Sequence, residues 1–203
     1  MAGQDLAIEC ACGAVKGMLR GVEPASGNHI VCMCDDCQAY ARFLGTDGIV
    51  DAHGGTEIFQ MPASLVSLTE GQQLVACVRL SSKGMHRWYA SCCRTPIANT
   101  LGPRVPFAGV IHCAIGAPLA GGDRNDALGP VLERVQGRFA PGGVPEGSRR
   151  TASLGLLLRM VGKVAGWWLR GLRGSPFFDS AGKPIVTPQV LTADERDALR
   201  ALR

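Results

Sequence analysis

Most of the chain's nine cysteines fall in three short clusters whose residue type and spacing suit metal binding. The clusters are Cys10 and Cys12, then Cys32, Cys34 and Cys37, and lastly Cys92 and Cys93. Thiolate sulfur is a preferred ligand of Zn²⁺, and packing alone does not explain cysteines that bunch at ligand spacing. We therefore predict that the chain holds one or two zinc ions. The solitary Cys77 and Cys113 should instead pack as small buried hydrophobes.

The middle cluster is the stronger candidate for chemistry. Three thiolates within six residues converge on one ion only if the loop wraps around it. Zinc prefers four ligands, so three cysteines leave one coordination position for water or an incoming group. A substrate thiol suits this position, because zinc binds the thiolate form and stabilises it at neutral pH. Cys32, Cys34 and Cys37 are therefore the predicted catalytic residues.

The first and last clusters offer ligands for a second ion. Gly13 permits a tight turn that would point Cys10 and Cys12 at one metal. Adjacent residues of an extended strand face opposite sides. We therefore expect one of Cys92 and Cys93 to be a ligand and the other to pack or to touch the second site.

Two other interpretations of the cysteines stay open. Cys34 and Cys37 form a Cys-x-x-Cys pair that could cycle through a disulfide, as in a redox relay. The cysteines could also be inert packing residues. Iron–sulfur clusters fit the spacing less well, because each needs a fourth suitably placed cysteine.

Composition indicates a globular protein of a reducing compartment. With 203 residues, 46% of them hydrophobic, the chain can bury a core as one domain with an extension or as two small units. The net charge of +4 falls short of the basic density expected for a nucleic-acid partner, so none is predicted. The first ten residues contain Asp5 and no apolar segment follows, so we predict no secretory signal. We expect a cytoplasmic location, where thiols stay reduced.

Alternating apolar and polar residues predict a mainly β domain over residues 1–140. Zinc bound by the cysteine clusters should cross-link its sheet. The clearest alternation spans residues 74–81, and Lys83-Gly84 then predicts a turn into a second strand at His86–Ala90. Further strands are expected at residues 57–61, 65–69, 107–111 and 131–139, and a short helix at residues 35–43.

Residues 141–148 (PGGVPEGS) predict a linker, and residues 149–203 a helical extension. Apolar residues on one side of the helical wheel of residues 151–173 are Leu154, Leu157, Val161, Val164, Trp168 and Leu172. Arg159, Lys163, Arg170 and Arg173 line the opposite side. This basic side should be solvated, while the apolar side should pack on its own domain or a second subunit, or lie on a membrane surface.

The same helix cannot span a bilayer, because Arg159 and Lys163 interrupt its apolar run. We therefore expect no transmembrane segment, and peripheral membrane contact stays an open alternative. Thr192 and Glu195 have the spacing of a capping box, which predicts a last helix ending near Leu202.

Histidines contribute no predicted site, because none has metal-ligand spacing with another and a solitary histidine is usually structural. They are His29, His53, His86 and His112. Arg87, Trp88 and Tyr89 are either partners for a peptide carboxylate or ordinary residues of an alternating strand.

Taken in order, the cysteine motifs resemble those of the glutathione-dependent formaldehyde-activating enzyme and centromere protein V family. The shared pattern is Cys-x-Cys-Gly-Ala-Val from Cys10, Cys-x-Cys-x-x-Cys from Cys32, and a cysteine before Thr95-Pro96. It covers residues 8–115 but not the C-terminal part. The resemblance implies a β-rich fold with a structural zinc and an active zinc beside a small-molecule thiol such as glutathione.

The resemblance also assigns residues to the two sites. Cys10, Cys12 and Cys93 would hold the structural zinc, and Cys32, Cys34 and Cys37 the active one. The implied activity is addition of glutathione to formaldehyde to give S-hydroxymethylglutathione, a carbon–sulfur lyase reaction. The alternative function is a non-enzymatic zinc module whose basic helix binds a membrane surface or a protein partner.

The chain departs from the family pattern at the last motif. The family closes with Cys-x-x-Cys-Gly-Thr, whereas here Ala90 stands three residues before Cys93 and Arg94 replaces the glycine. Cys92 then becomes the candidate fourth ligand of the structural site. The alternative is a structural site that is incomplete and empty.

Overall fold

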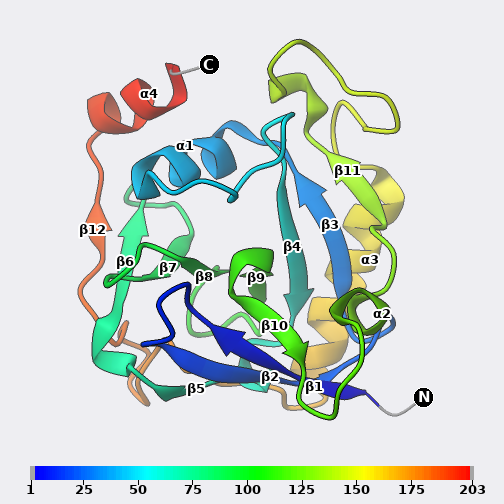
Figure 1. Cartoon of the computed structure of the whole chain (residues 1–203), viewed down its shortest axis with the longest axis vertical. Helices are drawn as coiled ribbons and strands as arrows, with labels where there is room; N and C mark the ends of the chain where they lie inside the picture. The colour runs from blue at the N-terminus through cyan, green and yellow to red at the C-terminus, as the bar shows by residue number, and fades with distance from the viewer. Residues whose placement is uncertain (1–2, 202–203) are drawn as a thin grey trace.

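The computed structural model describes residues 3–201, and most of its regular structure is β-strand arranged in two sheets (Figure 1). The four-stranded sheet runs in the order β10 (Ile115–Pro118), β1 (Gln4–Glu9), β2 (Lys16–Val22) and β5 (Val66–Glu70). The eight-stranded sheet runs in the order β11 (Glu133–Val135), β3 (Asn28–Cys32), β4 (Thr56–Met61), β9 (Ala108–Ile111), β8 (Pro96–Thr100), β7 (His86–Ala90), β6 (Val75–Arg79) and β12 (Gln189–Val190). The predicted mainly β fold class is confirmed.

Helices connect and cover these sheets. The α-helices of the described residues are α1 (Asp35–Leu44), α2 (Arg124–Leu128), α3 (Leu154–Leu169) and α4 (Ala193–Ala201). One-turn 3-10 helices lie at η1 (Ala63–Leu65), η2 (Gln72–Leu74), η3 (His112–Ala114) and η4 (Gly137–Phe139). No helix between residues 3 and 201 has the length and apolar character needed to cross a membrane.

Side chains from both sheets form the main hydrophobic core. Leu6 and Ile8 of β1 join Phe59, Trp88 and Val110 of the larger sheet, and none of them is more than 1% exposed. Burial of such large apolar side chains supplies most of the driving force for folding. The Trp88 indole N–H donates to the Thr100 hydroxyl at 2.9 Å, so its polar atom is also satisfied.

Helix α1 packs on the opposite face of the larger sheet. Tyr40 and Leu44 of the helix share a second core with Val78 and Ile111 of the strands. The Tyr40 hydroxyl donates to the Trp88 carbonyl at 3.1 Å. Because α1 begins three residues after β3 ends, the middle cysteine cluster lies where a sheet strand turns into a helix.

Several predicted elements are confirmed. Strands β6 and β7 form the predicted antiparallel hairpin, with Val78 opposite Arg87. Helix α1 and strands β4, β5 and β9 also form where the pattern placed them. The strand predicted at residues 131–139 is reduced to β11, because Gln136 adopts a left-handed conformation with φ of 62° and a 3-10 turn follows.

The C-terminal residues share the core of the β domain. Phe177 is fully buried and stacks on Trp88, with 4.9 Å between ring centroids. Strand β12 adds to the edge of the larger sheet beside β6. The capping box before α4 is present, since the Thr192 N–H donates to Glu195 Oε2 at 2.8 Å. The predicted end of this helix at Leu202 lies outside the described residues.

Helix α3 packs on the domain through a different side from the predicted one. Its buried residues are Leu156 and Trp167, whereas Leu154 is 71% exposed. Two residues of the predicted solvated basic side contact the domain: the Arg159 guanidinium donates to Asn28 Oδ1 at 2.7 Å, and the Lys163 ammonium donates to the Ala25 carbonyl, although Arg159 as a whole stays exposed. Leu156 and Trp167 lie on the same side of the helix as these two cations and draw it onto the domain.

Candidate metal centres and an apolar cleft

The first and last cysteine clusters meet in one four-cysteine site. The sulfur atoms of Cys10, Cys12, Cys92 and Cys93 all lie within 4.8 Å of one another. Cys12 and Cys92, 80 residues apart in sequence, have sulfurs separated by 3.3 Å. Four thiolates at such spacing make a complete tetrahedral ligand set, as in structural zinc sites.

Two tight turns bring these cysteines together. Gly13 has φ of 74° and its N–H donates to the Cys10 carbonyl at 2.8 Å, which closes the first turn. Residues 91–93 also form a turn, followed by Arg94 in the left-handed region with φ of 59°. The expectation that Cys92 and Cys93 face opposite sides is therefore wrong, because this backbone is not extended; their sulfurs lie 3.8 Å apart.

The surroundings of the four-cysteine site differ from one cysteine to the next. Burial and hydrogen bonds to neighbouring thiols raise the pKa of Cys92 to about 12. The Val15 N–H donates to the Cys10 sulfur at 3.2 Å. Burial opposes ionisation of Cys93, but hydrogen bonds from the Thr95 hydroxyl and nearby backbone lower its pKa to about 6. The Thr95 hydroxyl also accepts from the Ala11 N–H at 3.0 Å, which ties the two turns together. This donor set fits a closed zinc site with no position left for a substrate.

The middle cluster forms a separate three-cysteine site. Cys32 ends β3, Cys34 caps α1 and Cys37 lies in the first helical turn, and their sulfurs lie within 4.8 Å of one another. The Cys34 sulfur accepts a hydrogen bond from the Cys37 N–H at 3.4 Å. A strand end followed at once by a helix start therefore wraps the backbone around one point.

Hydrogen bonds among the three thiols of this site, together with burial, raise their pKa values. A hydrogen bond to Cys34, together with burial, raises the pKa of Cys32 to about 12. A hydrogen bond to Cys32 and burial likewise raise the pKa of Cys37 to about 12. A divalent cation would offset the repulsion between three buried thiolates, so the donor set fits a soft metal ion with one open coordination position.

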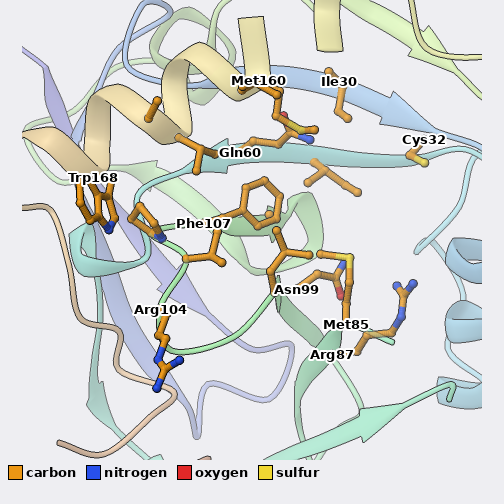
Figure 2. Close-up of a pocket in the computed structure, with 18 of the residues that line it drawn as sticks. Ile30, Cys32, Gln60, Met85, Arg87, Asn99, Arg104, Phe107, Met160 and Trp168 are labelled. Atoms are coloured by element: carbon orange, nitrogen blue, oxygen red, sulfur yellow. The ribbon is translucent and has the colours of Figure 1, made fainter. Parts of the chain in front are cut away.

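The three-cysteine site lies in the wall of a cleft of about 890 Å³, and the other site does not (Figure 2). One face of the larger sheet forms the floor, with alternate residues such as Ile30, Ile58 and Phe107. The start of α1 closes one end and the side of α3 forms a wall that includes Val164 and Trp168. The lining is largely apolar, as is usual for small-molecule pockets.

A row of four polar residues and one glycine crosses the larger sheet, and four of the five line the cleft, the exception being Asn28. In the strand register, Arg87 lies opposite Asn99, Asn99 opposite Gly109, Gly109 opposite Gln60, and Gln60 opposite Asn28. We call these five residues the polar row. The Asn28 amide donates to Gln60 Oε1 at 3.2 Å, and Asn28 also accepts from Arg159 of α3. This end of the row is therefore satisfied within the protein.

The hydrogen-bonding groups at the other end of the polar row are not all satisfied within the described residues. Arg87 Nη1 and Asn99 Oδ1 are buried and lack a hydrogen-bond partner within the described part of the chain. Burial opposes the charge of Arg87, but Cys37, Cys34 and Asp36 nearby raise its pKa. Its Nη2 atom lies 3.9 Å from Asp36 Oδ2, too far for a hydrogen bond, and its guanidinium lies over the Tyr40 ring. Buried polar atoms are normally satisfied, so this pair is a candidate position for a bound polar group.

The histidines have structural surroundings. His29 bonds Glu57 Oε1 at 3.1 Å and the Gly129 carbonyl at 2.7 Å, and His86 stacks on Trp88. Among residues 3–201, no group of potential metal ligands includes a histidine. Cys77 is buried as predicted, and Cys113 is partly buried against the core beneath α1.

Sequence reasoning missed Asn99, Gly109 and Gln60 as site residues, because their grouping depends on strand register. Arg87 was considered either as a partner for a peptide carboxylate or as an ordinary residue of an alternating strand. The available signal was the presence of Asn99 and Gln60 next to apolar residues within predicted or short strand segments, where a buried amide needs a partner.

Comparison with known proteins adds no ligand or reaction. Residues 3–188 match a protein family of unknown function (DUF6151). No curated protein matches the chain. A crystal structure of a Rhodobacter sphaeroides protein is similar over 62% of this chain and 96% of that chain, with 17% sequence identity and a TM-score of 0.40.

Proposed function

Since this chain belongs to a family of unknown function (DUF6151), we propose its activity from its own residues: a zinc-dependent enzyme of the carbon–sulfur lyase type. It adds a small-molecule thiol such as glutathione to a carbonyl compound. Cys32, Cys34 and Cys37 hold the active zinc, and the four-cysteine site holds a structural zinc.

The observation that carries this proposal is the contrast between the two cysteine sites. The four-cysteine site offers a full ligand set, whereas the three-cysteine site lies in the cleft wall with one ligand fewer. Zinc held by three cysteines would bind an incoming thiol as its thiolate at neutral pH. The cleft then provides the space in which the second reactant meets that thiol.

The reaction adds an S–H bond across a C=O double bond. A carbon–sulfur bond forms, the π bond of the carbonyl breaks, and the proton that leaves sulfur ends on the carbonyl oxygen. The step needs no oxidant and releases no leaving group. Arg87 Nη1 would donate a hydrogen bond to the oxygen as negative charge develops there, and the largely apolar lining of the cleft would strengthen this interaction.

The direct test is consumption of a free aldehyde by the wild-type protein. We expect zinc-loaded protein to contain two zinc ions per chain and to speed the loss of formaldehyde or octanal mixed with glutathione. Protein treated with a chelator serves as the control for the uncatalysed reaction. The proposal fails if the zinc-loaded protein accelerates the loss of neither aldehyde.

A second candidate function is a zinc module that binds an anionic membrane through α3, and the exposed apolar residues of that helix favour it. Leu154 and Leu158 are 71% and 63% exposed, and Arg170 and Arg173 lie farther along the chain. We expect wild-type protein, but not the Leu154→Asp, Leu158→Asp double variant, to sediment with anionic vesicles at unchanged zinc content. Val190→Asp, on an exposed strand residue, is the matched control. Equal sedimentation of all three proteins would exclude this function.

A further inference from the structure

We propose that the carbonyl substrate of the cleft carries an aliphatic chain, and that Arg87 and Asn99 bind its polar end. The inference rests on the proposed function only for the identity of the reacting group. The cleft itself, with its apolar walls and two unpartnered polar atoms, indicates the shape and polarity of what it binds.

The apolar part of the cleft is larger than formaldehyde requires. Its volume of about 890 Å³ is typical of pockets that enclose molecules of many atoms. Along its rim, Leu101, Val161 and Leu169 are 53%, 62% and 78% exposed. Water against this much apolar surface is unfavourable, and an aliphatic chain lying between α3 and the sheet would displace it.

The polar part of the cleft is small and lies beside the three-cysteine site. Arg87 Nη1 is a hydrogen-bond donor and Asn99 Oδ1 an acceptor, and the two residues are directly opposite on neighbouring strands. A carbonyl oxygen can accept from Arg87. The hydroxyl formed by thiol addition can both accept from Arg87 and donate to Asn99, so the product satisfies both atoms.

Gly109 presents bare backbone to the cleft beside Asn99. It lies between Asn99 and Gln60 in the polar row and carries no side chain. A Cβ atom there would come within 3.0 Å of Ile58 Cγ2, so a larger residue would crowd the floor. The head of the ligand can therefore lie against the backbone of Gly109 beside Asn99, with the chain extending toward Trp168 of α3 (Figure 2).

The distribution of charge on the cleft favours a ligand that is neutral along its chain. The charged residues that line it are Asp36, Arg87 and Arg104. Asp36 is paired with Arg200 of α4, and Arg104 is exposed. An aliphatic carbonyl compound places no unpaired charge against the apolar walls, whereas a ligand charged along its length would lose hydration without gaining partners.

Octanamide is a suitable probe, because it has an aliphatic chain, a carbonyl acceptor and N–H donors but cannot react with a thiol. We expect isothermal titration calorimetry to show binding of octanamide to the zinc-loaded protein. Each methylene removed, down to butanamide and acetamide, should weaken binding by up to about fourfold. Methyl octanoate accepts but does not donate hydrogen bonds, and should bind about tenfold more weakly than octanamide.

Two residues of α3 provide a matched pair of variants. Val161 and Leu158 are 62% and 63% exposed, but only Val161 lines the cleft. Val161→Asp should weaken octanamide binding at least about tenfold, because a charge then faces the chain, while Leu158→Asp should change it less than about twofold. Asn99→Leu should abolish the preference for octanamide over methyl octanoate.

The outcomes separate this inference from the proposed function. Binding of octanamide with the expected variant effects, in a protein that adds no thiol to any aldehyde, would support the inference and remove the proposed function. Rapid addition of glutathione to formaldehyde but not to octanal would retain the function and overturn the inference. Octanamide binding no tighter than acetamide, or equally affected by Val161→Asp and Leu158→Asp, would also overturn it.

Discussion

Replacing Cys12 by serine is expected to lower the free energy of unfolding of the zinc-loaded protein by more than about 4 kcal/mol. Cys12 lies in the turn after β1, and its sulfur is 3.3 Å from that of Cys92, 80 residues later. Zinc at this site would cross-link the small sheet to the turn after β7. Serine is a poor zinc ligand, so the cross-link is lost. Urea denaturation followed by tryptophan fluorescence measures the change.

Two controls make this expectation specific to the metal. Cys113→Ser, at a partly buried cysteine outside both sites, should cost only about 1 kcal/mol. After chelation, wild type and Cys12→Ser should have the same stability, because the wild type has then lost the same cross-link. A Cys12→Ser variant that keeps full stability in the presence of zinc would show that the four cysteines are not a structural site.

The cysteine sites were largely predictable because metal-ligand spacing is local in sequence. Cys32, Cys34 and Cys37 needed only a strand end and a helix start, both of which the sequence indicated. The four-cysteine site was harder to predict, because its full ligand set depends on a turn at residues 91–93. The alternation of apolar and polar residues does not indicate this turn. That turn, followed by Arg94 in the left-handed region, explains why the sulfurs of two adjacent cysteines can reach the same site.

Helix α3 shows the limit of a helical wheel. A helical wheel identifies which residues share a side of the helix. Because α3 has apolar residues on every side, the wheel does not determine which side packs on the domain. Leu156 and Trp167 form that face, and the residues predicted to be buried, such as Val161, border the cleft instead. The difference matters for the proposed function, because the side of α3 expected to pack on the domain, a second subunit or a membrane forms one wall of the cleft.

The polar row could not be predicted as a group from the sequence, for a different reason. Its five residues come from five strands, and each contributes one polar or small residue that looks isolated in its own segment. A shift of one residue in any strand pairing would turn that side chain to the other face of the sheet. Register is a tertiary property, so the alignment of Arg87 with Asn99 appears only in the folded protein.

Replacing Cys34 by serine is expected to abolish thiol addition while preserving the fold. Cys34 is a ligand candidate of the three-cysteine site and also the N-cap of α1, where its sulfur accepts from the Cys37 N–H. Serine is a preferred N-cap residue, so the helix start keeps its capping hydrogen bond. The metal site loses one of three ligands, and we expect the rate of aldehyde loss to fall more than about 100-fold.

Metal content and stability show whether that loss has the proposed cause. Cys34→Ser should retain one zinc per chain, at the four-cysteine site, and should unfold within about 1 kcal/mol of the wild type. Cys12→Ser shows the reverse dependence, with a large loss of stability. If Cys34→Ser keeps two zinc ions and full activity, the three-cysteine site is not the reactive one, and Arg87 would face no reacting carbonyl. The two serine variants together therefore assign fold stabilisation to one site and chemistry to the other.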